Sequence, residues 1–157
     1  MPETTFLTKE ELKSVIYVYQ IDQITEEDDD IVYMAISSAV DLVKSFLRPN
    51  NKREWLDGRI RYDVDTVFAA TGTERNDLLL DLCKDVAVWN LTKLCNLDII
   101  YDQAKDRFDR AIDFLKKVNK GDITLDLPEV TPPPPPENGS DEYTPFRFGS
   151  RKKFNHE

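Results

Sequence analysis

The sequence contains very little of what enzymes use for catalysis or for holding cofactors. His156 is the one histidine among 157 residues, so no serine or cysteine can be paired with a histidine on a rigid scaffold. Only five glycines are present, and no glycine-rich phosphate loop is found among them. The acidic run at residues 26–30 lacks the central glycine of a calcium loop and fits the start of a helix better. We therefore expect no enzymatic activity, no cofactor and no metal site.

Cysteines and long apolar runs are also scarce. Cys83 and Cys95 fall in one apolar segment, and on a single helix they would lie about 18 Å apart, well beyond the ~7 Å limit of a disulfide. No stretch approaches the ~20 apolar residues of a membrane span, and the first residues lack the basic start and apolar run of a signal peptide. We expect a soluble protein, made in a cytoplasm, without a membrane partner.

Acidic residues, in contrast, are abundant, and they are unevenly distributed. Residues 1–136 hold 26 Asp and Glu against 17 Lys and Arg, a net charge of −9, whereas residues 137–157 hold four of each kind. An acidic body repels a phosphate backbone, which argues against nonspecific DNA binding over the whole surface. A regulatory DNA-binding protein that uses Arg59 and Arg61 stays open as a weaker alternative.

Apolar periodicity predicts an all-α fold with four helices. Thr8 and Glu11 have capping-box spacing for a short helix to about Ile16, and Thr25 is the candidate N-cap of a long helix that ends at Arg48-Pro49. A third, largely buried helix is expected over 74–95, and a fourth over about 98–119 with Gly121 as its C-terminal cap. The short connection between the last two predicts antiparallel packing.

Residues 48–73 have a different pattern. Asp57-Gly58 is a turn signal, and Ile60, Tyr62 and Val64 alternate with polar residues. This predicts a small β-hairpin inserted in a loop. Arg53, Arg59 and Arg61 from this segment are candidates for contacts with carboxylates of a neighbouring subunit or of another protein.

The fourth helix also carries four carboxylates at spacings of four, three and four residues: Asp102, Asp106, Asp109 and Asp113. Helical geometry places them together, opposite the apolar face. They form either an ordinary solvated face or a surface that repels a polyanion such as DNA.

The chain ends in a proline-rich spacer and a polar, aromatic tail. We divide it into a helical domain at 1–127, a spacer at 128–136 with five consecutive prolines, and an extended tail at 137–157. The tail combines aromatic and cationic residues, which are strong contributors at interfaces, and the docking candidates are Phe146, Arg147, Phe148, Arg151, Lys152, Lys153 and Phe154. A ligand for a soluble proline-binding domain is the alternative interpretation of the spacer.

The order of these segments resembles the small helical head-tail connector (adaptor) family of tailed bacteriophages, including Mu-like relatives. The resemblance covers residues 6–127 and is carried by "SAVDLVKSFLRP", "LLLDLCKDVAVWNLT" and "AKDRFDRAIDFLKKVNKGDITLDLP". Its most telling part is the pattern of Arg107, Phe108, Ala111, Phe114 and Leu115, followed by "KGDITL".

The resemblance implies a structural virion protein in the neck, between head and tail. It implies a homo-oligomeric ring, usually of twelve subunits, that docks on the portal protein through its C-terminal segment. It also implies a surface for a stopper or tail-completion protein and a central channel through which DNA passes without specific binding. Apolar residues beyond the needs of one small core, such as Trp55, Tyr62, Phe68 and Trp89, are candidates for contacts between subunits. The alternative function is a cytosolic interaction adaptor whose proline-rich tail recruits a soluble domain.

Overall fold

The structure is a computed structural model that describes residues 6–48, 60–93 and 98–130. These residues are helical apart from their connections, and they contain one isolated β-bridge and no strand. The elements in chain order are η1 (Lys9–Ser14), α1 (Val18–Thr25), α2 (Asp29–Leu47), α3 (Val64–Ala69), η3 (Gly72–Glu74), α4 (Asp77–Thr92) and α5 (Asp98–Lys120). The predicted all-α class is confirmed, although the described helices outnumber the four expected.

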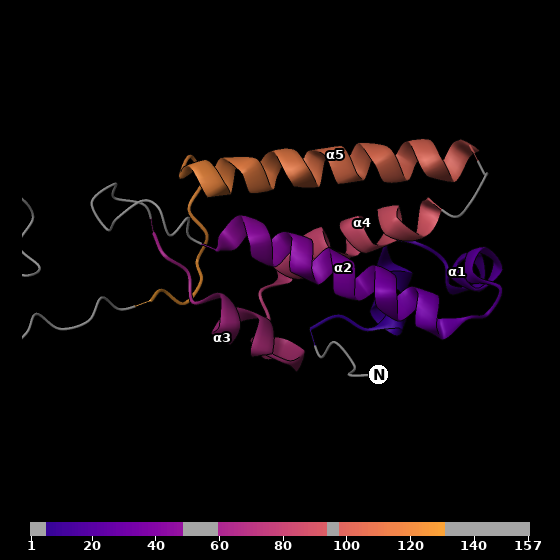
Figure 1. The fold of residues 1–157 in the computed structure, drawn as a ribbon, viewed down its shortest axis with the longest axis horizontal. Coiled ribbons are helices and arrows are strands. Elements are labelled where there is room, and N and C mark those ends of the chain that lie inside the picture. The colour runs from indigo at the N-terminus through magenta and orange to yellow at the C-terminus, as the bar shows by residue number, and fades with distance from the viewer. Residues whose placement is uncertain (1–5, 49–59, 94–97, 131–157) are drawn as a thin grey trace, which may run out of the picture.

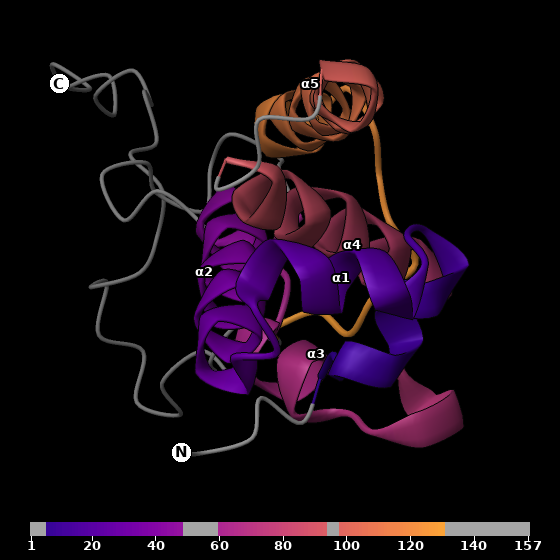
Figure 2. The same ribbon diagram turned by 90° about the vertical axis from the view of Figure 1, so that its right-hand side faces the viewer.

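Three long helices form the centre of the molecule. Helix α4 packs against both α2 and α5, so it lies between them (Figure 1). Helix α1 lies at the end where α4 ends and α5 begins, and it contacts both α2 and α4 (Figures 1 and 2). Helix α3 lies toward the opposite end, where the segment after α5 also runs (Figure 1). One end of the molecule is therefore formed by α1, and the other by α3 and the segment that follows α5.

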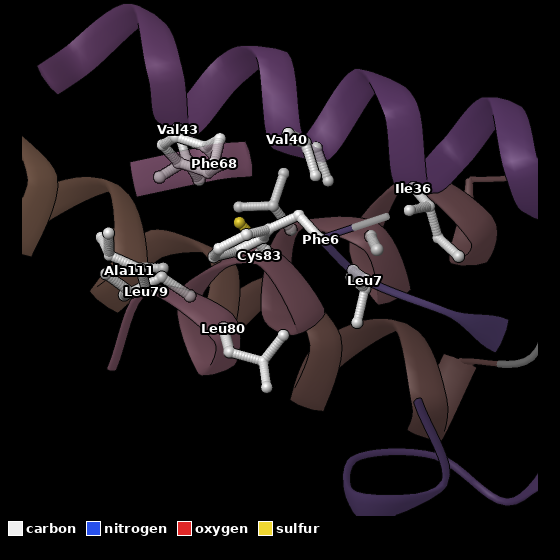
Figure 3. Packing of buried hydrophobic residues seen from close by; sticks show 14 of the residues in the cluster. Phe6, Leu7, Ile36, Val40, Val43, Phe68, Leu79, Leu80, Cys83 and Ala111 are labelled. Atoms are coloured by element: carbon white, nitrogen blue, oxygen red, sulfur yellow. The ribbon is translucent and has the colours of Figure 1, made fainter. Parts of the chain in front are cut away.

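The core is continuous across all these elements. Figure 3 shows side chains of α2 and α4 packed together with Phe6 and Phe68, whose ring centroids are 4.6 Å apart. Helix α4 has buried residues on several sides, from Leu79 to Leu91, in agreement with the predicted central buried helix. Leu115 of α5 is completely buried and closes this core from the other side.

The start of the second long helix differs from the prediction. Thr25 does not cap α2; it ends α1, and its hydroxyl donates a hydrogen bond to the Ile21 carbonyl. Glu26 and Glu27 then adopt left-handed backbone conformations, and the Asp28 side chain accepts a hydrogen bond from the Asp30 backbone N–H at the true N-terminus of α2. Thr25 and Asp28 are both suitable N-cap residues, and they lie three positions apart. The prediction chose the first of them because it did not anticipate the short helix α1, which ends at Thr25.

No hairpin is present in the described part of residues 48–73. Val64 begins helix α3 instead of continuing a strand, and the Asp63 carboxylate caps it by accepting from the Thr66 backbone N–H. Tyr62 forms the isolated bridge with Glu129, far along the chain, and not with a hairpin partner. The turn proposed at Asp57-Gly58 lies outside the described residues.

The ends of α4 and α5 follow ordinary capping rules. Asn76 caps α4 by accepting from the Leu79 backbone N–H, and Gly121, with φ of 87°, follows α5 in the left-handed conformation predicted for it. The next residues return across the bundle, and the Asp63 N–H donates to the Pro128 carbonyl while the Val130 N–H donates to the Arg61 carbonyl. Backbone pairing therefore attaches the chain to the body as far as Val130.

Candidate docking surface

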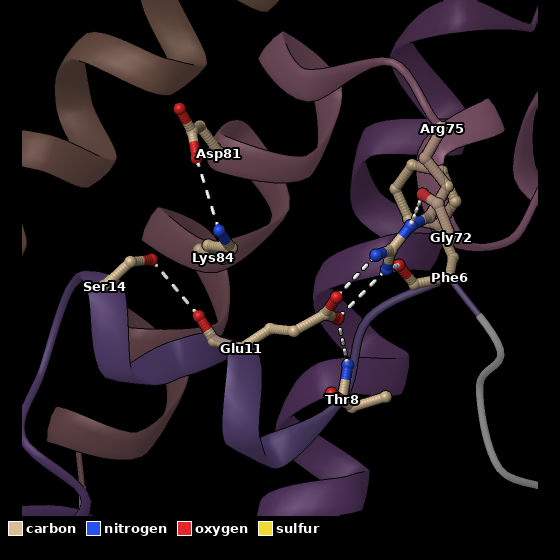
Figure 4. A network of polar contacts seen from close by, with 8 residues as sticks. All are labelled: Phe6, Thr8, Glu11, Ser14, Gly72, Arg75, Asp81 and Lys84. Atoms are coloured by element: carbon tan, nitrogen blue, oxygen red, sulfur yellow. Dashed lines mark hydrogen bonds and ion pairs between the residues drawn. The ribbon is translucent and has the colours of Figure 1, made fainter.

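The segment before α1 is fixed by a bidentate ion pair. Arg75, just after η3, places its two terminal nitrogens 2.9 Å and 2.5 Å from the carboxylate oxygens of Glu11 in η1 (Figure 4). The same guanidinium donates to the carbonyls of Phe6 and Gly72. Glu11 in turn accepts from the Thr8 backbone N–H, which completes the predicted capping box. One arginine thus anchors η1 to residues more than 60 positions away.

This contact changes the acid strength of Glu11. The hydrogen bonds from Arg75, followed by the one from Thr8, lower the pKa of the Glu11 carboxyl from 4.5 to about 2, although partial burial acts in the opposite direction. The carboxylate is therefore ionised throughout the neutral range, and the ion pair holds η1 in place there.

A groove lies where the η1–α1 junction meets α4 and α5. Its volume is about 460 Å³, and it is lined by residues 13–17 and Gln20 on one side and by Val88, Gln103, Ala104 and Arg107 on the other. Arg107 also donates to the Val15 carbonyl at 3.1 Å, which connects the two walls. No carboxylate lines the groove, whose polar groups include Lys13, Arg107 and two glutamine amides. It therefore favours an acceptor-rich ligand.

Two exposed tyrosines extend from this groove. Tyr17 lines it, and Tyr19 stacks on Tyr17 with ring centroids 5.7 Å apart and planes inclined by 18°. Their exposed fractions are 68% and 59%, unusually high for large aromatic side chains. Val18 between them is also exposed. An aromatic pair presented in this way is suited to contact with another chain.

Chemically reactive groups are few in the described residues. The described ranges contain no group of three or more His, Cys, Asp or Glu side chains that would hold a metal ion. Burial raises the pKa of the Cys83 thiol to about 12, so this thiol is a packing residue. Burial also raises the pKa of the half-buried Asp85 carboxyl, and the positive charge of Arg107 acts in the opposite direction. Cys95 lies outside the described residues.

The four carboxylates predicted to share a face do so on α5, and all four are exposed. Three of them pair with cations of the same helix: Asp106 with Arg110, Asp109 with Lys105 and Asp113 with Lys116. Such exposed pairs contribute little to stability, but they reduce the negative potential of the face.

The negative charge of the body is concentrated elsewhere. Residues 18–47, which cover α1 and α2, hold seven Asp and Glu against one Lys, a net charge of −6. Residues 98–120 of α5 hold five Asp against six Lys and Arg, a net charge of +1. Lys9 of η1 bridges Asp22 and Asp29 at 2.8 Å and 2.6 Å, and most of the other acidic residues of α1 and α2 remain exposed. The most acidic surface therefore surrounds the turn between α1 and α2.

The other predicted contact residues are only partly described. Arg61 is half-buried beside the Tyr62–Glu129 bridge and has interactions of its own. Arg53, Arg59 and the tail residues 146–154 lie outside the described residues, so their predicted roles remain predictions.

Three of the four aromatic residues expected at contacts between subunits pack against other residues of their own chain. Tyr62 and Phe68 are each only 6% exposed, and the Tyr62 hydroxyl accepts from the Leu125 backbone N–H at 2.9 Å. Trp89 stacks on Phe108 and packs against Tyr101. Trp55 lies outside the described residues. The most exposed aromatic side chains of the described residues are instead Tyr17 and Tyr19, which the sequence pattern did not single out.

Comparisons with known proteins give one match. Residues 6–142 match the model of the family described as Bacteriophage Mu, Gp36, which spans the described helices and continues beyond them. No curated protein and no solved structure matches the chain. In the described part of the chain, no helix has the length and apolar character needed to cross a membrane. The family match confirms the resemblance to Mu-like phage proteins, and the chain belongs to the bacteriophage Mu Gp36 family.

Proposed function

We propose that this phage protein is a head-tail connector subunit that forms a ring beneath the portal, with the twelve subunits implied by the resemblance. The observation that carries the proposal is the family match over residues 6–142, which includes the whole helical body and part of the segment that follows. The location is then the neck of the virion, after assembly in the host cytoplasm. The role is mechanical and requires no catalytic group.

The charge of the body supports such a position. The described residues hold 23 Asp and Glu against 14 Lys and Arg, so the folded part carries a net charge of −9. A ring through which DNA slides should not hold the polyanion, and an acidic surface fulfils that condition. A stopper or tail-completion protein would meet the other end of the same ring.

The C-terminal tail supplies the portal contact in this proposal. Phe146, Phe148 and Phe154 would fill apolar pockets, and Arg147, Arg151, Lys152 and Lys153 would pair with acidic groups of the portal. Each tail loses affinity through the cost of ordering it, but the copies of a ring bind together and compensate through multivalency.

Deletion of residues 137–157 tests the portal contact. The truncated chain and the full chain are each mixed with portal particles of the same phage, and ring formation is followed by electron microscopy and sedimentation. The full chain should form rings on the portal, whereas the truncated chain should retain its helical circular dichroism and lose attachment. If the full chain forms no ring with the portal, the connector proposal is wrong. If both chains attach equally, the tail has another role.

A pair of charge variants tests which surface faces the DNA channel. One variant replaces Asp102, Asp106, Asp109 and Asp113 with lysine. Its matched control places four lysines at other exposed acidic positions, which are Glu10, Asp41, Glu74 and Asp126. If the α5 face lines the channel, DNA ejection from virions slows in the first variant and not in the control. Equal rates in both variants would remove this assignment.

The hairpin-region arginines have a similar test. Arg53, Arg59 and Arg61 are proposed to pair with carboxylates of a ring neighbour or of the next neck protein. Alanine at all three positions should then weaken neck assembly, and unchanged assembly would contradict the assignment.

A further inference from the structure

We propose that the groove beside Tyr17 and Tyr19 receives the proline-rich, acidic segment at residues 131–143 of a second copy of the chain. The segment reads "TPPPPPENGSDEY", so five prolines are followed within six residues by three carboxylates. The groove and the segment each have two chemical features, and these features correspond.

The first correspondence is between prolines and tyrosines. Proline-rich segments in polyproline geometry dock on exposed aromatic side chains because the extended helix is already formed before binding and loses little entropy. Tyr17 and Tyr19 present stacked rings that are 68% and 59% exposed, directly beside the groove. The other described residues leave most of both rings accessible to solvent. In contrast, the rings of Phe6 and Phe68 are buried in the core.

The second correspondence is between carboxylates and the polar lining. Lys13 and Arg107 are the charged residues of the groove, and Gln20 and Gln103 add amide donors. This is an unusual lining in a body of net charge −9, where most of the surface would repel Glu137, Asp141 and Glu142. The groove is thus a local exception that matches an acidic segment.

The length of the chain indicates that the segment comes from another copy. Val130 is hydrogen-bonded to Arg61 near α3, whereas α1 lies at the other end of the molecule (Figure 1). Along α5 alone, Arg107 and Lys120 are about 20 Å apart. Pro132 lies at most about 7 Å and Pro136 at most about 21 Å from Val130 in a fully extended chain. The start of the proline run therefore stays near the α3 end of its own chain, and we assign the docked segment to a second copy, which has no such constraint.

A synthetic peptide of residues 130–143 with a fluorescent label tests the docking. The peptide is titrated with the full chain, and binding is followed by fluorescence polarisation. We expect saturable binding that weakens about tenfold or more in the Tyr17→Ser/Tyr19→Ser double variant and in Lys13→Glu. Both tyrosines and Lys13 are exposed, so these changes leave the fold intact, which circular dichroism verifies.

Matched controls separate this site from general adhesion. Met34→Ser removes an equally exposed apolar side chain, 68% exposed, on α2 outside the groove, and Lys117→Glu reverses an exposed charge far along α5. Neither change should alter binding. A peptide with glutamine or asparagine in place of its carboxylates should bind more weakly and with less dependence on salt.

The source of the segment is tested in the full chain. A photo-crosslinking amino acid at position 19 should join two chains, and a mixture of isotopically light and heavy chains should give hybrid cross-links to residues 131–143. Absence of saturable binding up to about 1 mM chain, equal binding to the tyrosine double variant, or cross-links confined within one chain would each overturn the proposal. No phage component enters these assays, so their failure leaves the connector proposal unaffected.

Discussion

Replacement of Glu11 by glutamine should destabilise the chain in a way that depends on pH. The substitution keeps the size of the side chain and removes the charge that Arg75 contacts at 2.9 Å and 2.5 Å. The pKa of the carboxyl falls from 4.5 to about 2 on folding, which corresponds to an upper limit of about 3 kcal/mol at neutral pH. Because 28% of the Glu11 side chain is exposed, solvent screening reduces the expected loss to about 1–2 kcal/mol.

The sign of the pH dependence follows from the depressed pKa. The ionised form is favoured in the folded state, so its stabilisation is complete above pH 4.5 and is lost as the pH falls from 4.5 toward 2. All other carboxylates are common to the wild-type and variant chains. The difference between the two chains therefore isolates Glu11.

Urea denaturation followed by circular dichroism at pH 7, 4 and 2.5 measures this difference. The free energy of unfolding of the variant should lie about 1–2 kcal/mol below that of the wild type at pH 7, and this difference should shrink severalfold by pH 2.5. Glu10→Gln, at an exposed position next to Glu11, is the matched control and should remain close to the wild type. A difference that stays constant from pH 7 to 2.5 would refute an electrostatic role for the pair.

Three other predictions concern the core. Leu115→Ala, at a completely buried position, should lower the free energy of unfolding by about 2–5 kcal/mol in urea denaturation, and a loss below about 1 kcal/mol would contradict the described packing of α5. Tyr62→Phe leaves the buried Leu125 backbone N–H without its acceptor, so thermal and urea denaturation should show a loss of about 1–3 kcal/mol. With Cys95 changed to serine, the Cys83 thiol should resist alkylation at pH 8 until the chain unfolds, because its pKa is about 12; rapid labelling of the native chain would contradict its burial.

The long helices were predictable because their own sequences contain the necessary signals. The heptad-like spacing of α5 and the cap at Gly121 are local, and the structure reproduces both. The first turn of α2 was placed wrongly because Glu26 and Glu27 follow α1 in left-handed backbone conformations. Glycine and asparagine are the residues that usually indicate such conformations, and neither is present there. A six-residue helix such as α3 has less than two turns, too few for periodicity to distinguish it from a strand.

The groove could not be predicted from sequence because its parts come from distant positions. The η1–α1 junction and α5 are about 90 residues apart in the chain, and only packing on α4 brings them together. Arg107 was noticed as part of a family pattern, but its contact with the Val15 carbonyl is a long-range feature. The available signal was the pair of tyrosines two positions apart at the start of α1, because tyrosine is enriched at contact surfaces.

The count of acidic residues in the sequence was a poor guide to which surface is most negative. Four aspartates on one helix indicate a strongly negative face, but the cations that accompany them at three or four positions are equally part of that surface. The net charge of +1 for residues 98–120, against −6 for residues 18–47, moves the strongest repulsion for a polyanion to the other side of the bundle. At a Debye length of about 8 Å, DNA responds to the local balance of charges within a turn or two of helix and not to the total for the chain. If one surface of the described body repels DNA, its local charge therefore indicates the surface around the α1–α2 turn and not the face of α5.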